Sequence, residues 1–180
     1  MDKLLKSSHE NKEMARNEGC TACVALLVKD KLYVASAGDS RCVVVSKGGV
    51  HPLTEDHRPL DDNERMRIIN AGGEIIRGRV NGNLNLSRAI GDLDFKANDT
   101  LSRSEQLIIS NPDIRTWDIS NNDQFFVIGC DGIWGRYEMK EVCHYLSLLY
   151  QKGKSLREAN EDLLDSLLSK DLKSKLIYFR

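Results

Sequence analysis

The chain has 180 residues, of which 41% are hydrophobic and 29% charged. This length and composition suit one globular domain with a sizeable core. The formal net charge of -1 gives no general attraction to nucleic acid or to an anionic membrane. No apolar run approaches the roughly 20 residues that span a bilayer, and the first residues lack the apolar centre of a secretory signal.

Five cysteines are present, an odd number, and they lie in apolar runs rather than in a loop framework. This pattern favours reduced thiols and predicts an intracellular protein, cytoplasmic or nuclear. Cys20 and Cys23 have the spacing of a zinc or redox pair, but no second pair accompanies them. Residues three apart in a strand face opposite sides, so we expect both thiols to be ordinary core residues.

The first third of the chain contains three strand-like runs. Residues 1–18 are polar and predict a frayed helix or a loop. The apolar runs 20–28, 32–37 and 41–46 are separated by short turns rich in glycine, aspartate and lysine. Their close succession predicts an antiparallel meander.

Helix-capping patterns occur twice. Asp61 and Glu64 have the spacing of a capping box, and glycines 72–73 provide a stop for the helix that would follow. Ser155 and Glu158 repeat the capping pattern later in the chain. Both patterns predict where a helix begins.

The remaining elements alternate between strands and helices. Short strand-like pieces lie at 74–76 and 84–86, and the apolar run 125–130 is the strongest candidate for a buried strand. Apolar periodicity predicts helices at 138–150 and 156–169. Strands with helices added outside them predict an α+β layered fold.

Two aspartates directly follow apolar strands, and each adjoins a glycine: Gly38-Asp39 and Asp131-Gly132. A carboxylate at the end of a buried strand must be solvated, hydrogen-bonded or paired with a cation. Carboxylate oxygens suit Mg²⁺ or Mn²⁺ better than zinc. Spacing alone also allows each aspartate to be a simple turn residue, because Asp-Gly is a common turn pair.

Residues 19–145 contain a series of short polar and glycine-containing motifs. In chain order they are Gly19-Cys20-Thr21-Ala22, Ala37-Gly38-Asp39-Ser40-Arg41, Leu53-Thr54-Glu55-Asp56-His57-Arg58-Pro59, Glu64-Arg65, Ala71-Gly72-Gly73, Arg79-Val80-Asn81-Gly82 with Leu84, Ser87-Arg88-Ala89-Ile90-Gly91-Asp92, Pro112-Asp113-Ile114 and Cys130-Asp131-Gly132-Ile133-Trp134. Each motif is weak evidence alone, but in this order they resemble the metal-dependent serine/threonine protein phosphatases of type 2C.

The resemblance implies an antiparallel β-sandwich flanked by helices, a four-layer αββα arrangement, truncated here at both ends. It divides the chain into a polar N-terminal segment (1–18), a partial type 2C phosphatase domain (19–169) and a divergent C-terminal tail (170–180). Strands missing from such a domain would leave sheet edges and core surface exposed.

The resemblance also implies a binuclear Mg²⁺ or Mn²⁺ centre that hydrolyses phosphoserine and phosphothreonine in a phosphorylated protein substrate. By position, Asp131 matches a metal ligand and Asp39 matches a residue of an additional, weaker metal position. Asp92 is expected to have a structural role first. No residue is assigned as catalytic, and neither nucleic acid nor membrane is expected as a partner.

Three departures from the family pattern bear on activity. The aspartate-glycine-histidine-glycine motif that bridges the two metals is absent, Gly135 stands where the family usually has an aspartate, and the late aspartate-asparagine motif does not occur. Two function classes therefore remain: a metal-dependent phosphatase, as a fragment or degenerate member, and a non-catalytic module that binds phosphoproteins or regulates a phosphatase. We expect little or no activity from the isolated chain.

Other polar residues have structural interpretations. His57, in a loop ahead of a proline, is expected to be structural rather than a general base. Arg79, Arg88 and Arg103 would suit a phosphate-facing basic edge. The favoured alternative pairs Arg41 and Arg88 with carboxylates inside the fold.

Overall fold

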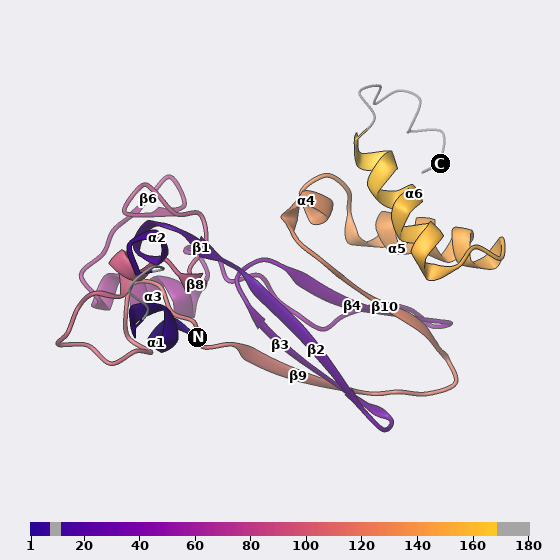
Figure 1. Ribbon diagram of the computed structural model, residues 1–180, viewed down its shortest axis with the longest axis horizontal. Coiled ribbons are helices and arrows are strands. Elements are labelled where there is room, and N and C mark those ends of the chain that lie inside the picture. Colours follow the sequence, from indigo (N-terminus) through magenta and orange to yellow (C-terminus); the bar gives the residue numbers. More distant parts are fainter. Residues whose placement is uncertain (8–11, 169–180) are drawn as a thin grey trace.

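The computed structural model describes residues 1–7 and 12–168 and is built around two antiparallel three-stranded sheets (Figure 1). One sheet has the order β2-β3-β9 and the other β10-β4-β5. The strand bounds are β2 Ala22–Val28, β3 Lys31–Ala37, β9 Asp113–Asp118, β4 Arg41–Ser46, β5 Gly49–Pro52 and β10 Asp123–Gly129. The predicted α+β sandwich is confirmed.

The space between the sheets is filled by alternate residues of the two central strands. Leu32 and Val34 of β3 point toward Cys42 and Val44 of β4, and all four side chains are buried in one cluster. Because side chains alternate along a strand, the intervening residues of β4 face the opposite side. Strand β4 is therefore buried on both faces, which explains its uninterrupted apolar sequence.

The predicted meander is wrong at its third strand. Strand β2 pairs with β3, but β4 lies in the other sheet, between β10 and β5. At Gly38 the backbone has φ of +107°, and the chain crosses there from one sheet to the other. Strand β4 has apolar residues for two faces, so it is more stable at the centre of a sheet covered on both sides than at an exposed edge.

Helices α5 (Met139–Gln151) and α6 (Leu156–Leu168) cover the outer face of the β10-β4-β5 sheet (Figure 1). Their buried residues form one cluster with Val43 and Val45 of β4. The Ser155 hydroxyl donates to Glu158 at 2.7 Å, and the Glu158 amide donates back to Ser155 Oγ at 3.3 Å. The predicted capping pair of the second helix is thus confirmed.

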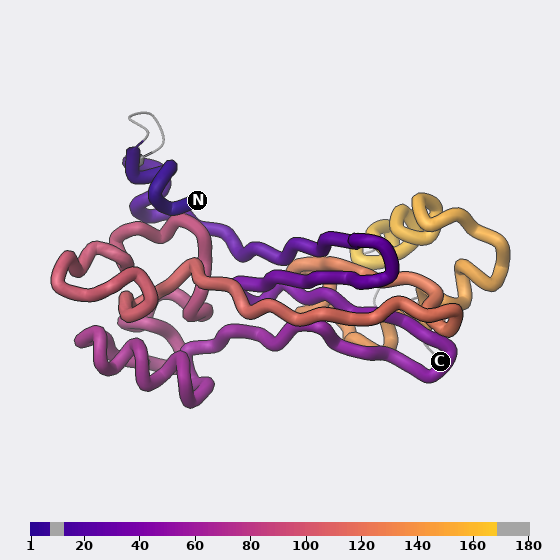
Figure 2. The backbone as a smooth tube through the Cα atoms, turned by 90° about the horizontal axis from the view of Figure 1, so that it is seen from below, coloured from indigo at the N-terminus to yellow at the C-terminus, as the bar shows by residue number. Residues whose placement is uncertain are grey.

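The opposite end of the molecule is built from short elements, seen on the left in Figure 2. A small core of Ile68, Val80, Ala89 and Ile108 lies among them. The elements are α1 Asp2–Ser7, α2 Lys12–Asn17, β1 Gly19–Cys20, α3 Asp62–Asn70, β6 Ile75–Ile76, β7 Arg79–Val80, β8 Ile90–Gly91 and the 3-10 helix η1 Leu93–Lys96. The segment 1–18, predicted as a frayed helix or a loop, thus contains α1 and α2, whereas the tail 170–180 lies outside the described residues.

The capping box predicted for α3 does not form. Asp61 is the N-cap residue, but its side chain accepts a hydrogen bond from the Arg58 amide instead of an amide inside the helix. Glu64 is buried and interacts with arginines. Ion pairing with residues distant in sequence has displaced the local cap.

The outer face of the β2-β3-β9 sheet is exposed. Val24, Leu26, Tyr33 and Ile114 on this face are 61%, 59%, 40% and 67% exposed. A contiguous apolar surface of this kind is unusual on an isolated domain, and it agrees with the core surface expected from a truncated sandwich.

Two predictions of burial are wrong. In β10, which is an edge strand paired only with β4, Phe126 and Ile128 are 41% and 40% exposed. Cys20 is exposed and Cys23 is half-buried, so the expected core packing holds only in part for Cys23. Among the described helices, none has the length and apolar character needed to cross a membrane.

Candidate metal centre

Strand pairing brings Asp39 and Asp131 together. Arg41, the first residue of β4, is paired with Gly129, the last residue of β10. Asp39 lies two residues before Arg41, and Asp131 lies two residues after Gly129. Because the strands are antiparallel, both aspartates emerge at the same end of the same strand pair.

The backbone at Asp39 is held by a close approach that only glycine permits. A β-carbon at Gly38 would lie 2.4 Å from Thr21 Cγ2, and the φ of +107° also favours glycine. The neighbouring hydroxyls of Thr21 and Ser40 are 2.6 Å apart, within hydrogen-bonding distance. The Gly38-Asp39 turn is therefore fixed against the start of β2.

His57 supports the same turn from the other side. Its Nδ1 lies 3.1 Å from the backbone nitrogen of Gly38, and its own amide donates to the Gly38 carbonyl at 3.0 Å. Its Nε2 lies 3.1 Å from Asp113 Oδ2. The side chain is 4% exposed, so its expected structural role is confirmed. The sequence did not indicate that its role is to position the residue next to Asp39.

Asp131 begins the short helix α4 (Asp131–Trp134), directly after β10 and Cys130. The indole nitrogen of Trp134 donates to the Gly129 carbonyl at 2.6 Å, which ties the helix back to the strand end. The Asp131 residue is exposed. Its carboxylate is therefore available to solvent and to a ligand.

Asp39 lies in a field of negative charge. Burial raises its pKa above the ordinary value, and the charges of Asp131 and Asp56 raise it further. The negative charge of Asp56 is largely balanced by two arginines. Arg41 donates to both of its oxygens at 2.7 and 2.8 Å, and Arg58 donates to one of them at 2.7 Å. The repulsion left between Asp39 and Asp131 is of the kind that a bound cation relieves.

Two cavities adjoin the aspartate pair. One of about 310 Å³ and one of about 260 Å³ are both lined by Asp39, Asp131 and Asn85. The first also reaches Asp92, and the second reaches the Arg41 and Asp56 pair. The structure thus brings the two predicted metal ligands to one solvent-filled site.

Asp92 lines the first of these cavities, but its side chain is held by its own packing. It has a left-handed backbone, with φ of 48°, and is 6% exposed. Its Oδ2 would lie 2.0 Å from a β-carbon at Gly19, so it packs directly against the backbone of β1. Burial raises its pKa. These contacts agree with the structural role expected for it.

The chemistry of the donors fits a divalent cation only in part. Asp39 and Asp131 supply hard oxygen ligands with net negative charge, as Mg²⁺ and Mn²⁺ require. Within residues 1–7 and 12–168, however, no group of three or more histidine, cysteine, aspartate or glutamate side chains is arranged to hold a metal ion. Two aspartates alone do not make a complete ligand set for such an ion.

The arginines are engaged as the favoured alternative predicted. Arg41 pairs with Asp56, and Arg88 pairs with Glu64 at 2.6 Å and Asp113 at 2.7 Å. Arg79 donates to the Asn83 carbonyl. The hypothesis of a basic edge made of Arg79, Arg88 and Arg103 fails at Arg88, whose side chain is only 14% exposed.

Comparison with known sequences gives consistent matches. The family model described as Protein phosphatase 2C matches residues 1–176. "Probable protein phosphatase 2C 21" of Arabidopsis thaliana is 44% identical over 153 residues, which is 85% of this chain and 43% of the relative. "Protein phosphatase 2C 1" of Paramecium tetraurelia is 41% identical over 184 residues, covering 95% of this chain and 61% of that protein.

Solved structures agree with the sequence matches. A phosphatase from Toxoplasma gondii superposes with a TM-score of 0.71 at 31% identity, over 78% of this chain and 45% of that one. A serine-threonine phosphatase 2C from the same organism gives a TM-score of 0.74 at 22% identity, over 93% of this chain and 57% of that one, and it supports the fold. The chain spans about half the length of the relatives it matches. It belongs to the protein phosphatase 2C family.

Proposed function

We propose that this chain is the part of a metal-dependent protein serine/threonine phosphatase that contributes Asp39 and Asp131 to the metal centre. The observation that supports the proposal is the antiparallel pairing of β4 and β10, which brings both carboxylates to one cavity. The substrate class is a phosphoserine or phosphothreonine of a phosphorylated protein, as the names of the relatives suggest.

Mg²⁺ or Mn²⁺ bound there would supply an activated water and neutralise phosphoryl charge. The residues of this chain have more limited roles. Asp39 and Asp131 bind, His57 holds the backbone beside Asp39, and Arg41 keeps Asp56 neutralised next to the site. Because affinity for such ions depends on ligand number and charge, two carboxylates alone bind weakly. The isolated chain is accordingly proposed to have little or no turnover.

A second function class is supported by the same incomplete ligand set. A phosphatase-like module that lacks turnover would bind phosphoproteins or regulate an active phosphatase. The two candidates differ in metal-dependent hydrolysis. They share the fold and the substrate class.

The deciding experiment is a Mn²⁺ titration by calorimetry, combined with a phosphothreonine-peptide assay on the same folded 180-residue chain. Binding tighter than millimolar, with turnover lost in Asp131→Ala, would support an active enzyme and overturn the proposed inactivity. Binding that is weak and lost in Asp131→Ala, without turnover, is the expected result. Mn²⁺ binding that is unchanged in both Asp131→Ala and Asp39→Ala would refute the assignment of the site.

A further inference from the structure

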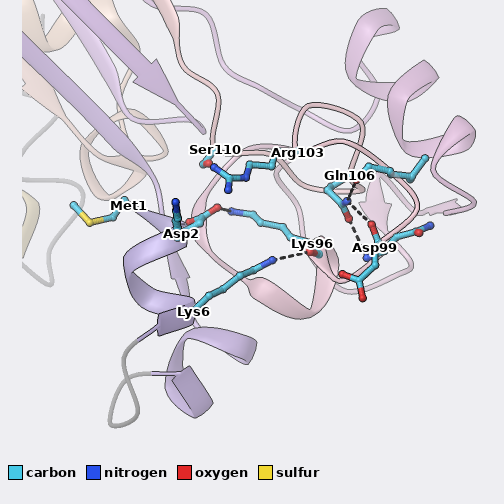
Figure 3. Close-up of a pocket in the computed structure, with 11 residues that line it drawn as sticks. Met1, Asp2, Lys6, Lys96, Asp99, Arg103, Gln106 and Ser110 are labelled. Carbon is cyan, nitrogen blue, oxygen red and sulfur yellow. Dashed lines mark hydrogen bonds and ion pairs between the residues drawn. The ribbon is translucent and has the colours of Figure 1, made fainter.

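A second polar pocket lies beside the N-terminal helix α1 (Figure 3), and its lining residues do not include Asp39 or Asp131. Its volume is about 320 Å³. Four cationic side chains line it: those of Lys3, Lys6, Lys96 and Arg103. Its carboxylates are those of Asp2 and Asp99. None of the contacts described for the metal centre uses these cations.

Lys96 is the most buried cation of this pocket. Its side chain is 6% exposed, and its ammonium donates to the Ala89 carbonyl and to Asp2 Oδ2, each at 2.6 Å. Burial lowers the pKa of Lys96, although the Asp2 carboxylate opposes the shift. A buried ammonium without an anionic partner is strongly unfavourable. Asp92 acts on Lys96 only through its charge, without an ion-pair contact, so the position in contact with the ammonium favours an anion.

Asp2 supplies that anion. Besides Lys96, its carboxylate accepts a hydrogen bond from the Gly91 amide at 3.0 Å, and Ser110 lines the same pocket. An ammonium and a backbone N–H that converge on one oxyanion are donors that bind phosphate in many proteins. The Asp2 carboxylate thus occupies a preformed oxyanion site.

The attachment of α1 is polar. The six-residue helix has no buried residue, and its contacts in this region are those of Asp2 and of Lys6, whose ammonium donates to the Lys96 carbonyl at 3.2 Å. In Figure 3 dashed lines join both residues to Lys96. A short helix with no fully buried residue is released at low cost when another anion competes for its contacts.

Charge favours phosphate over a carboxylate as the competing ligand. Without Asp2 the pocket is lined by four cationic side chains and the carboxylate of Asp99, and Asp92 is a further negative charge near Lys96. Within the described ranges, neither Lys3 nor Arg103 forms an ion pair. A dianion gains more than a monoanion from such an excess of positive charge.

We propose that the pocket formed by Lys96, the Gly91 amide and Ser110 is a binding site for a phosphate group carried by a phosphorylated peptide, and that Asp2 occupies it as an internal competitor. The site is separate from the metal centre and binds without hydrolysis. Its occupation displaces α1 from the body of the protein.

The test follows the Gly91 amide by nuclear magnetic resonance while the metal-free 180-residue chain is titrated. The ligands are inorganic phosphate, a phosphoserine peptide, its unphosphorylated form, and acetate. We expect Asp2→Ala to bind the phosphopeptide at least ten-fold more tightly than the wild type, with the largest shift at Gly91. Asp94→Ala is the matched control, because it removes an exposed acidic residue of the adjacent 3-10 helix that pairs with Arg16.

Several outcomes overturn the proposal. Equal affinity of Asp2→Ala and wild type would show that Asp2 does not compete. If Lys96→Met or Ser110→Ala, made in the Asp2→Ala background, leaves phosphopeptide affinity unchanged, the peptide binds exposed cations and not this pocket. If inorganic phosphate binds and the phosphoserine peptide does not, the ligand is not a phosphate group carried by a protein. If Asp2→Ala does not fold, saturating phosphopeptide on the wild type must still shift Gly91 and release α1, and absence of both effects refutes the site.

Discussion

Arg88 holds Glu64 through two nitrogens: Nε lies 3.0 Å and Nη2 2.6 Å from Glu64 Oε1. The other oxygen of Glu64 accepts from Ser87 and from Arg67, at 2.6 and 2.7 Å. Arg88 also reaches Asp113 at the start of β9. One buried carboxylate thus connects α3 with the 87–88 segment. Through Arg88 it is also linked to Asp113, which contacts His57.

Removing this carboxylate is expected to be strongly destabilising. Glu64→Ala leaves Arg67 and Arg88 partly buried without their partner, and we expect the free energy of unfolding to fall by roughly 3–5 kcal/mol. Urea unfolding measures the change. The matched control is Glu55→Ala, which breaks the exposed pair with Arg115 and should cost less than about 1 kcal/mol. Equal losses in the two variants would contradict the central role of Glu64.

The same residue predicts a pH dependence. Burial by itself would raise the pKa of Glu64, but hydrogen bonds from Arg88 and Ser87 and the charge of Arg67 outweigh it, so the pKa is lowered. The stabilisation is therefore fully present above the unfolded-state pKa of about 4.3 and is lost as pH falls through the lower folded-state value. The difference in unfolding free energy between wild type and Glu64→Gln should shrink from pH 7 to pH 3. A difference that stays constant between pH 7 and pH 3 would argue against this contribution of the ionised Glu64.

Asp39→Asn is expected to stabilise the metal-free chain. The raised pKa of Asp39 means that the folded state binds its proton more tightly than the unfolded state, so the ionised carboxylate costs stability at pH 7. Neutralising it should raise the free energy of unfolding by about 0.5–1 kcal/mol, since the site is partly solvated. Asp30→Asn, in an exposed turn, should change it by less than about 0.5 kcal/mol. Mn²⁺ should raise the melting temperature of the wild type more than that of Asp39→Asn.

Gly19 and Asp92 should be energetically coupled. A β-carbon at Gly19 would lie 2.0 Å from Asp92 Oδ2 and 2.5 Å from its Cγ, so Gly19→Ala must displace a buried carboxylate. We expect a loss of about 1–3 kcal/mol. In the Asp92→Ala background only the Ile90 carbonyl remains close, at 3.0 Å, and Gly19→Ala should then cost clearly less. Additive losses in the double-mutant cycle would show that the two residues act independently.

Several local features were predictable because short stretches of sequence contain their cause. The pair Ser155 and Glu158 caps α6 through contacts three residues apart. The strands β2, β3 and β4 begin and end within a residue or two of the apolar runs that predicted them. The sequence predicted that Arg41 and Arg88 pair with carboxylates, because a buried guanidinium needs a carboxylate partner. It did not identify which carboxylates.

The sequence alone did not identify contacts between residues that are far apart in the chain. The capping box predicted for α3 failed because Glu64 pairs with Arg88, 24 residues away. The sequence did not indicate the Asp2–Lys96 pair, which spans 94 residues. Nor did it show that His57 supports Gly38. The Glu55-Asp56-His57 motif indicated only that polar residues gather there.

By itself the sequence determined the order and type of most elements, the family resemblance, and the two carboxylates that follow apolar strands. These depend on periodicity, capping and turn chemistry, which act over a few residues. Only the tertiary structure decided that β3 and β4 belong to different sheets, and that Asp39 and Asp131 meet through the pairing of β4 with β10. Strand pairing is selected by burial on both faces of β4, which depends on residues far apart in the chain.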